Sequence, residues 1–219
     1  EDRVVYRKRL GNDAALVLRA RMSAARGQWE EAVPMLRTVH ERNPNDLETI
    51  HLLATALSNL DSAGDAEAFL KECAEKNPEN PGIWVELGNY YLNNASETGL
   101  SKASSAFSKA LSLQNNDYRG LRGLFEVQLR TGNPGAALAL CNRYLKQQPD
   151  DPAMLGEKAR LLMQAGGDQD EALRAVERAL ELEQRPLFHY IRGHLRLNKQ
   201  EYAGAIEDLQ RFAQSGADA

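Results

Sequence analysis

Small and apolar side chains recur along this chain at a spacing typical of packed helices. Alanine stands at six positions inside helix-like runs, and five of these alanines are followed four residues later by a larger apolar side chain. Residues four apart lie on one face of an α-helix, so each alanine marks a buried helix face. Steps of 33 to 37 residues separate the alanines, which predicts a tandem repeat. The alanines are Ala32, Ala66, Ala103, Ala137, Ala172 and Ala205.

A second set of small residues lies in the predicted helix that precedes each alanine. Five repeats carry alanine or glycine where the two helices would cross, at Ala20, Ala54, Gly88, Ala159 and Gly193. The fourth repeat has Phe125 there, and we expect its ring to push the helices apart. Gly27, Gly132 and Gly166 stand between paired helices, where a left-handed cap residue is expected. We expect six helix pairs in one continuous solenoid, with repeats at 13–46, 47–80, 81–117, 118–151, 152–185 and 186–219.

The third repeat carries a recognisable motif. Its first predicted helix has the pattern W-x2-L-G-x2-Y, formed by Trp84, Leu87, Gly88 and Tyr91, and A-x3-F follows at residues 103–107. On these residues the chain resembles the tetratricopeptide repeat (TPR) family, and the resemblance covers all six repeats. It implies an all-α fold, a right-handed α-solenoid in which antiparallel helix pairs stack into a superhelix.

Composition and charge exclude several classes of function. The formal net charge of −4 and the pI near 5.7 argue against nucleic-acid binding, which needs a basic face. No apolar run approaches the ~18 residues of a membrane-spanning helix, so we expect no membrane insertion. Nucleotide-binding, zinc-protease and CxxC motifs are absent, and the four histidines lack metal-ligand spacing. We therefore expect no enzyme activity, no cofactor, no metal, and buried free thiols at Cys73 and Cys141.

The resemblance also implies where a partner would bind, because in this family the first helices of the repeats line a concave groove. When the groove-facing helix positions of the family are carried over to this sequence, they hold a row of side-chain amides and three further residues. Amides both donate and accept hydrogen bonds, so the row suits the backbone of an extended segment. The alternative is that asparagine near a helix end only favours a left-handed cap. The row is Asn59, Asn93, Gln164 and Asn198, and the further residues are Asn89, Tyr190 and His194.

Arginines form the other candidate feature of this groove. Arg119, Arg122 and Arg130 share one face of the fourth repeat's first helix, with Glu126 among them, and Arg160 follows in the next repeat. One interpretation is a site for an acidic partner segment, because a single carboxylate does not neutralise four guanidinium groups. The other is an internal ladder, in which Glu126 bridges Arg122 and Arg130 at a spacing of four residues.

The two ends of the chain differ from complete repeats. Residues 1–12 contain Val4 and Val5 and are expected to be a linker or the tail of a preceding helix. The last helix offers Ile206, Leu209 and Phe212 with no polar helix after it. We expect a fragment of a longer repeat protein, or ends that pack on another chain, with end-to-end self-association as one form of this.

These features favour a noncatalytic scaffold that binds a segment of a partner protein in its groove. One alternative is a structural spacer or self-association module. Another is a part of a multidomain enzyme or bacterial envelope export machine that positions a substrate. The chain contains no recognisable targeting signal, which leaves the cytoplasm and the bacterial periplasm as candidate compartments.

Overall fold

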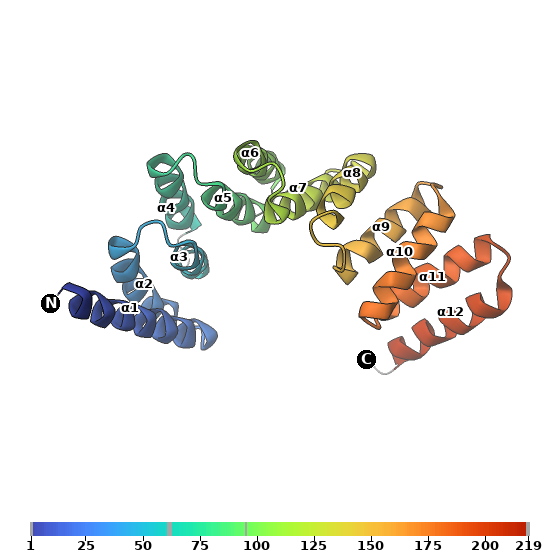
Figure 1. Ribbon diagram of the computed structural model, residues 1–219, viewed down its shortest axis with the longest axis horizontal. Helices are drawn as coiled ribbons and strands as arrows, with labels where there is room; N and C mark the ends of the chain where they lie inside the picture. The colour runs from blue at the N-terminus through green and yellow to red at the C-terminus, as the bar shows by residue number, and fades with distance from the viewer. Residues whose placement is uncertain (1, 61–62, 95, 218–219) are drawn as a thin grey trace. The chain divides into compact units, whose positions relative to one another are not determined.

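The computed structural model describes residues 2–60, 63–94 and 96–217, and this part of the chain is helical with no strand (Figure 1). It contains twelve helices, which confirms the expected all-α fold of helix pairs, one pair in each repeat window. The handedness of a superhelix stays a prediction. The helices are α1 (Asp2–Ala25), α2 (Trp29–Arg42), α3 (Leu47–Asn59), α4 (Ala63–Lys76), α5 (Pro81–Asn93), α6 (Glu97–Leu113), α7 (Tyr118–Arg130), α8 (Pro134–Leu145), α9 (Pro152–Gln164), α10 (Gln169–Leu182), α11 (Pro186–Asn198) and α12 (Tyr202–Ala217).

Local chemistry explains where these helices begin and end. The carboxylates of Asp46 and Asp151 accept backbone N–H groups in the first turns of α3 and α9, at 3.1 Å in both cases. Proline occupies the first position of α5, α8, α9 and α11, where no backbone donor is needed. Gly27, Gly132 and Gly166 have φ angles of +74°, +74° and +61°. The expected left-handed turns between paired helices are therefore confirmed.

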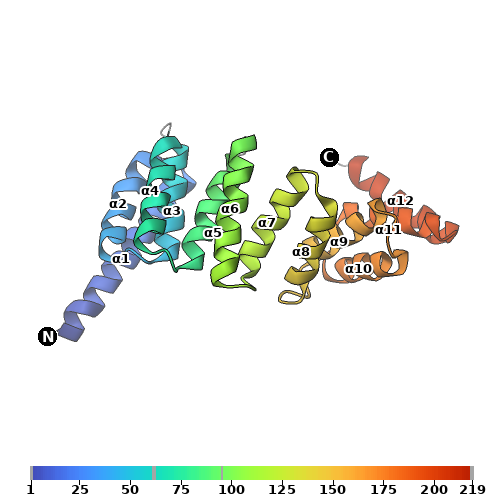
Figure 2. The same cartoon turned by 90° about the horizontal axis from the view of Figure 1, so that it is seen from above.

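Contacts between helices divide the chain into two compact bodies, each described by itself. The N-terminal body is residues 1–115 (α1 to α6), and the C-terminal body is residues 116–219 (α7 to α12). Within a body, second helices pack on their own first helix and on the next first helix. Successive first helices also touch, as α3 with α5 and α9 with α11. Within each body, no Cα atoms of successive second helices lie within 8 Å in the described residues, and Figure 2 shows α4 and α6 on either side of α5. Each body thus has a first-helix face and a second-helix face.

The small residues lie at close helix crossings. A Cβ atom added to Gly88 would lie 2.6 Å from a ring carbon of Phe107, whose side chain is fully buried. A Cβ atom on Gly193 would lie 2.9 Å from Leu209 in the same way. Phe125 is 4% exposed and is therefore part of the core. Its expected effect on the distance between α7 and α8 stays a prediction.

The segment expected as a separate tail, residues 1–12, does not stand apart where the structure describes it. Helix α1 runs from Asp2 to Ala25 without a break, so residues 2–12 continue into the first helix of the first repeat. The residue that weakens a helix most near this junction is Gly11, and a single glycine in a helix costs only about 1 kcal/mol. The side chains of Val4 and Val5 lie outside the described side chains.

Candidate functional site

Polar contacts link the first helices of the N-terminal body. Arg21 of α1 forms an ion pair with Glu48 of α3. Nδ1 of His51 on α3 lies 2.8 Å from a carboxylate oxygen of Glu86 on α5. This hydrogen bond raises the pKa of His51 above its ordinary value of 6.5, although burial opposes it. The first-helix face is thus joined across its repeats by charged and titratable groups.

The same face holds a pocket of about 720 Å³ between α1 and the turn before α3. Leu18 lines it and is 59% exposed, beside Val17. Buried Asp13 forms the polar wall and accepts a hydrogen bond from Nη1 of Arg42 at 2.6 Å. Sequence reasoning missed this pocket. The sequence feature that could have indicated it is the pair Leu18 and Met22, two apolar residues four apart on α1 that the structure leaves exposed.

The amide row behaves differently from one position to the next. Asn59 is exposed, and its Nδ2 donates to the Thr55 carbonyl oxygen at 2.8 Å, within its own helix. Asn93 and Asn198 are exposed at the last positions of α5 and α11, and Asn89 is half-buried on α5. None of these asparagines is a left-handed cap, because Gln200 is the one described non-glycine residue with positive φ, at 63°. The cap explanation for the asparagines is therefore wrong.

Arginines of α7 have carboxylates of their own. Nη2 of Arg119 donates to Asp117 at 2.8 Å, and Nε of Arg130 donates to Glu126 at 2.8 Å. Arg122 is exposed and pairs with no carboxylate in the described residues, so Glu126 does not bridge it to Arg130. Of the two ion pairs expected in the internal ladder, the described residues thus show Glu126–Arg130 and not Glu126–Arg122.

Arg160 on α9 is similarly engaged, since its Nε donates to Glu157 at 2.9 Å and its Nη1 donates to Gln164 Oε1 at 2.9 Å. The expectation that Glu126 alone faces four arginines is wrong, because it left out Asp117 and Glu157. An acidic ligand would have to compete with these carboxylates, which reduces the gain from each contact.

Tyr190 and His194, one turn apart on α11, lie together. Their ring centroids are 4.4 Å apart, and the Tyr190 ring also lies 5.0 Å from that of Phe212 on α12. Both groove residues are half-buried. Tyr190 therefore packs partly within its own helix pair, in contact with His194 of α11 and Phe212 of α12.

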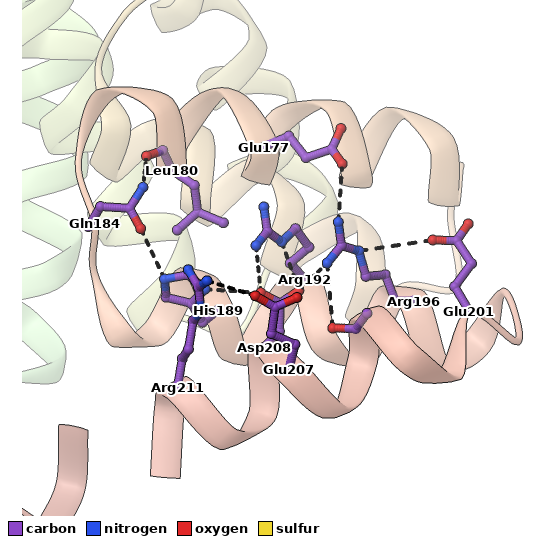
Figure 3. A network of polar contacts seen from close by, with 11 residues as sticks. Glu177, Leu180, Gln184, His189, Arg192, Arg196, Glu201, Glu207, Asp208 and Arg211 are labelled. Atoms are coloured by element: carbon purple, nitrogen blue, oxygen red, sulfur yellow. Dashed lines mark hydrogen bonds and ion pairs between the residues drawn. The ribbon is translucent and has the colours of Figure 1, made fainter. Parts of the chain in front are cut away.

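The C-terminal body contains a buried ionic network that sequence reasoning missed (Figure 3). The carboxylate of Asp208 is 1% exposed and accepts Nε of Arg192 at 2.8 Å and Nη1 of Arg196 at 2.8 Å. It also lies 3.0 Å from Nδ1 of His189. Burial alone would raise the pKa of Asp208, but the hydrogen bonds from Arg192 and His189 outweigh it and lower the pKa. These side chains join α11 to α12 on the second-helix side.

Other chemistry in the described residues is limited. Burial raises the pKa of the Cys73 thiol to about 11 and that of the Cys141 thiol to about 12, so both are poor nucleophiles at neutral pH. No group of three or more histidine, cysteine or acidic side chains is placed to hold a metal ion in the described part of the chain. No described helix has the length and apolarity needed to cross a membrane.

Similarity to known proteins agrees with the repeat architecture. The tetratricopeptide repeat profile matches residues 23–84, 100–161 and 132–195. The chain belongs to the tetratricopeptide repeat family. This fold suggests a protein–protein interaction scaffold, because TPR proteins bind other proteins.

Two kinds of relatives support this classification. The chain is 26% identical to ER membrane protein complex subunit 2-A of Xenopus laevis over 171 aligned residues. The aligned region covers 78% of this chain and 58% of the Xenopus protein. The structure resembles pilF of Pseudomonas aeruginosa with a TM-score of 0.74 at 16% identity, covering 97% of this chain and 100% of the other. It also resembles YrrB, described as a TPR protein with an unusual peptide-binding site, with a TM-score of 0.65 at 21% identity, covering 82% and 91%.

Proposed function

We propose that this chain is a noncatalytic scaffold whose first helices bind a segment of a partner protein. The observation that carries the proposal is the pocket of about 720 Å³ on the first-helix face of the N-terminal body. It combines an exposed apolar side chain, Leu18, with the charged side chains of Arg21 and Arg42. Apolar anchors beside polar groups are typical of surfaces that bind peptides. Similarity to a subunit of a protein complex supports the same role.

A photo-crosslinking amino acid tests the proposal. It would replace Leu18 or Thr55 on the first-helix face, and Glu41 or Arg174 on exposed second-helix positions as matched controls. After irradiation in cells that make the protein naturally, we expect a shared crosslinked partner from the first two positions and not from the controls. Leu18→Asp should then weaken binding of that partner about tenfold, since it places a charge in the apolar part of the pocket. Equal crosslinking from all four positions would refute the proposal.

The arginine face of the C-terminal body supports a finer version, in which part of the partner segment is acidic. Among the arginines of this face, Arg122 is exposed and pairs with no carboxylate in the described residues, although it hydrogen-bonds the side chain of Tyr144. Exposed ion pairs are worth about 0.2–1 kcal/mol, so Arg122→Glu should weaken binding of the crosslinked partner about two- to tenfold. Arg174→Glu gives the same change of charge on α10 and should leave the affinity unchanged. Equal affinities of both variants would remove the acidic segment from the proposal.

Self-association is a second candidate, favoured by the exposed apolar side chains of α12. Tyr202 is 60% exposed, Ile206 55% and Phe212 38%, whereas Leu209 is half-buried. Exposed apolar surface favours association by roughly 25 cal/mol per Å² that it buries. Sedimentation velocity at increasing concentration should show dimers that Ile206→Glu abolishes. Monomers at all concentrations would eliminate this candidate. The role as a substrate-positioning part of a larger enzyme or export machine stays a hypothesis.

A further inference from the structure

A pocket of about 470 Å³ lies on the second-helix face of the N-terminal body, between α4 and α6. We name it the α4–α6 groove. Its floor is formed by α5, through half-buried Trp84 and the small exposed parts of Leu87 and Tyr91. Its walls include Ala74 from α4 and Ala106 from α6. The groove exists because the backbones of the two second helices stay more than 8 Å apart, so part of the first helix between them is uncovered.

The preceding repeat provides an internal comparison. A pocket of about 440 Å³ lies at the same place between α2 and α4, with Leu53 at the position of Leu87. Where the α4–α6 groove has two alanine walls, this earlier pocket has His40 and Phe69, whose rings lie 5.0 Å apart. Glu72 and Lys76, which also line it, form an ion pair along α4. The two pockets are similar in size, and the α4–α6 groove is the more apolar of the two.

Charge differs between the two places as well. Lys102 and Lys109 line the α4–α6 groove at the repeat positions that Asp65 and Glu72 occupy one repeat earlier. These lysines are seven residues apart on α6, which places them about 10 Å apart along the helix. No carboxylate lies within ion-pair distance of the Lys109 ammonium in the described residues.

The other end of the groove carries a compact polar cluster. Glu67 accepts the ammonium groups of Lys71 at 2.8 Å and Lys102 at 3.1 Å and the hydroxyl of Tyr91 at 3.0 Å. The bonds from Lys71 and Lys102 lower the pKa of Glu67 to about 2. The ammonium of Lys102 also lies 5.1 Å from the centroid of the Tyr91 ring. One carboxylate is thus shared by two lysines. Glu75 also lines the groove, so Lys71, Lys102 and Lys109 are set against two carboxylates and the rim keeps a net positive charge.

We propose that the α4–α6 groove is a second docking site, separate from the first-helix face, for a short acidic segment of a partner protein. Apolar side chains of the segment contact Trp84 and Leu87, and its carboxylates pair with Lys102 and Lys109. Two ammonium groups about 10 Å apart call for two separated carboxylates. A peptide supplies these at chosen positions, whereas a fatty acid carries one at its end.

The groove contains its own reporter. The chain has two tryptophans, Trp29 and Trp84. Nε1 of Trp84 donates to the Pro78 carbonyl oxygen at 2.8 Å, so the indole is held in place beside the groove. In a Trp29→Phe protein, the emission of Trp84 alone reports on a segment that binds there.

The experiment selects the segment from a phage-displayed library of random 12-residue peptides, panned on the Trp29→Phe protein. Counter-selection uses the same protein with Ser105→Phe, which places a ring at the mouth of the groove from an exposed position. The matched control is Ser108→Phe, an exposed position on α6 that does not line the groove. We expect enriched peptides that combine Leu, Ile or Phe with Asp or Glu, that change Trp84 emission, and that bind the Ser108→Phe control normally.

A charge exchange tests the lysines separately. Lys102→Asp with Lys109→Glu installs the residues of the earlier repeat and should weaken peptide binding roughly five- to thirtyfold. Arg26→Asp with Lys146→Glu makes the same change in net charge at exposed positions elsewhere and should not. The proposal is overturned if the library gives no groove-dependent peptide, if the peptides lack acidic residues, or if both charge variants bind alike. Displacement of the peptides by dodecanoate at micromolar concentration would overturn it in favour of an anionic alkyl ligand.

Discussion

Removal of the Asp208 carboxylate should loosen the last helix pair more than any other single polar change in the chain. In Asp208→Asn, Arg192 and Arg196 lose the buried acceptor that both share, and His189 loses its partner at 3.0 Å. Breaking a fully buried ion pair costs about 3–5 kcal/mol. The arginine side chains are 18% and 21% exposed, so water recovers part of this, and we expect a loss of about 2–4 kcal/mol.

The measurement is amide hydrogen exchange along α11 and α12, because stability in repeat proteins is largely local to neighbouring repeats. We expect much faster exchange in α12 of the Asp208→Asn protein than in wild type. The control is Glu207→Gln on the same helix, which removes an exposed pair with Arg211 and should cost less than about 0.5 kcal/mol. Equal exchange in the two variants would refute the view that the buried network joins α12 to α11.

The pH dependence gives an independent check of the same network. The folded pKa of Asp208 lies below its ordinary value of 3.8. A carboxyl group with a depressed folded pKa stabilises the fold above its unfolded pKa and loses this contribution as pH falls through the folded pKa. The stability difference between wild type and Asp208→Asn should therefore be constant near pH 7 and shrink below about pH 4. A difference that grows on acidification would contradict the assignment.

Further substitutions test other parts of the fold. Gly88→Ala should cost about 1–3 kcal/mol in urea unfolding, since its Cβ would lie 2.6 Å from the buried ring of Phe107, and an unchanged midpoint would contradict this crossing. An NMR titration should give His51 a pKa above 6.5 that Glu86→Gln lowers; the bond then stabilises the fold below about pH 6.5, and this contribution is lost as pH rises through the folded value. The buried Cys141 thiol, with a pKa near 12, should react with a disulfide reagent only as fast as the protein opens locally, and rapid reaction would show that it is accessible.

Local and periodic features of this protein were predictable from its sequence. The alanine series and the small residues at helix crossings predict the helix pairs because residues four apart share a face whatever surrounds the helix. The left-handed conformations of Gly27, Gly132 and Gly166 were predictable as well, because the tight turn between paired helices alone requires their positive φ angles. The partners of the arginines were also within reach, because Asp117 and Glu157 lie two and three residues from Arg119 and Arg160.

What only the tertiary structure decided is how equivalent places differ between repeats. When the repeats are aligned, Ala106 of α6 and Asp208 of α12 occupy the same position. Leu87, on the floor of the α4–α6 groove, likewise corresponds to Arg192 of α11. The repeat pattern places all of these on second-helix sides, but it does not say which will be an open apolar groove and which a buried ionic network. That depends on side chains from three helices meeting in space. Because burial and pairing are properties of the assembled neighbours, the same backbone position can line an apolar groove in one repeat and carry a buried charge in another.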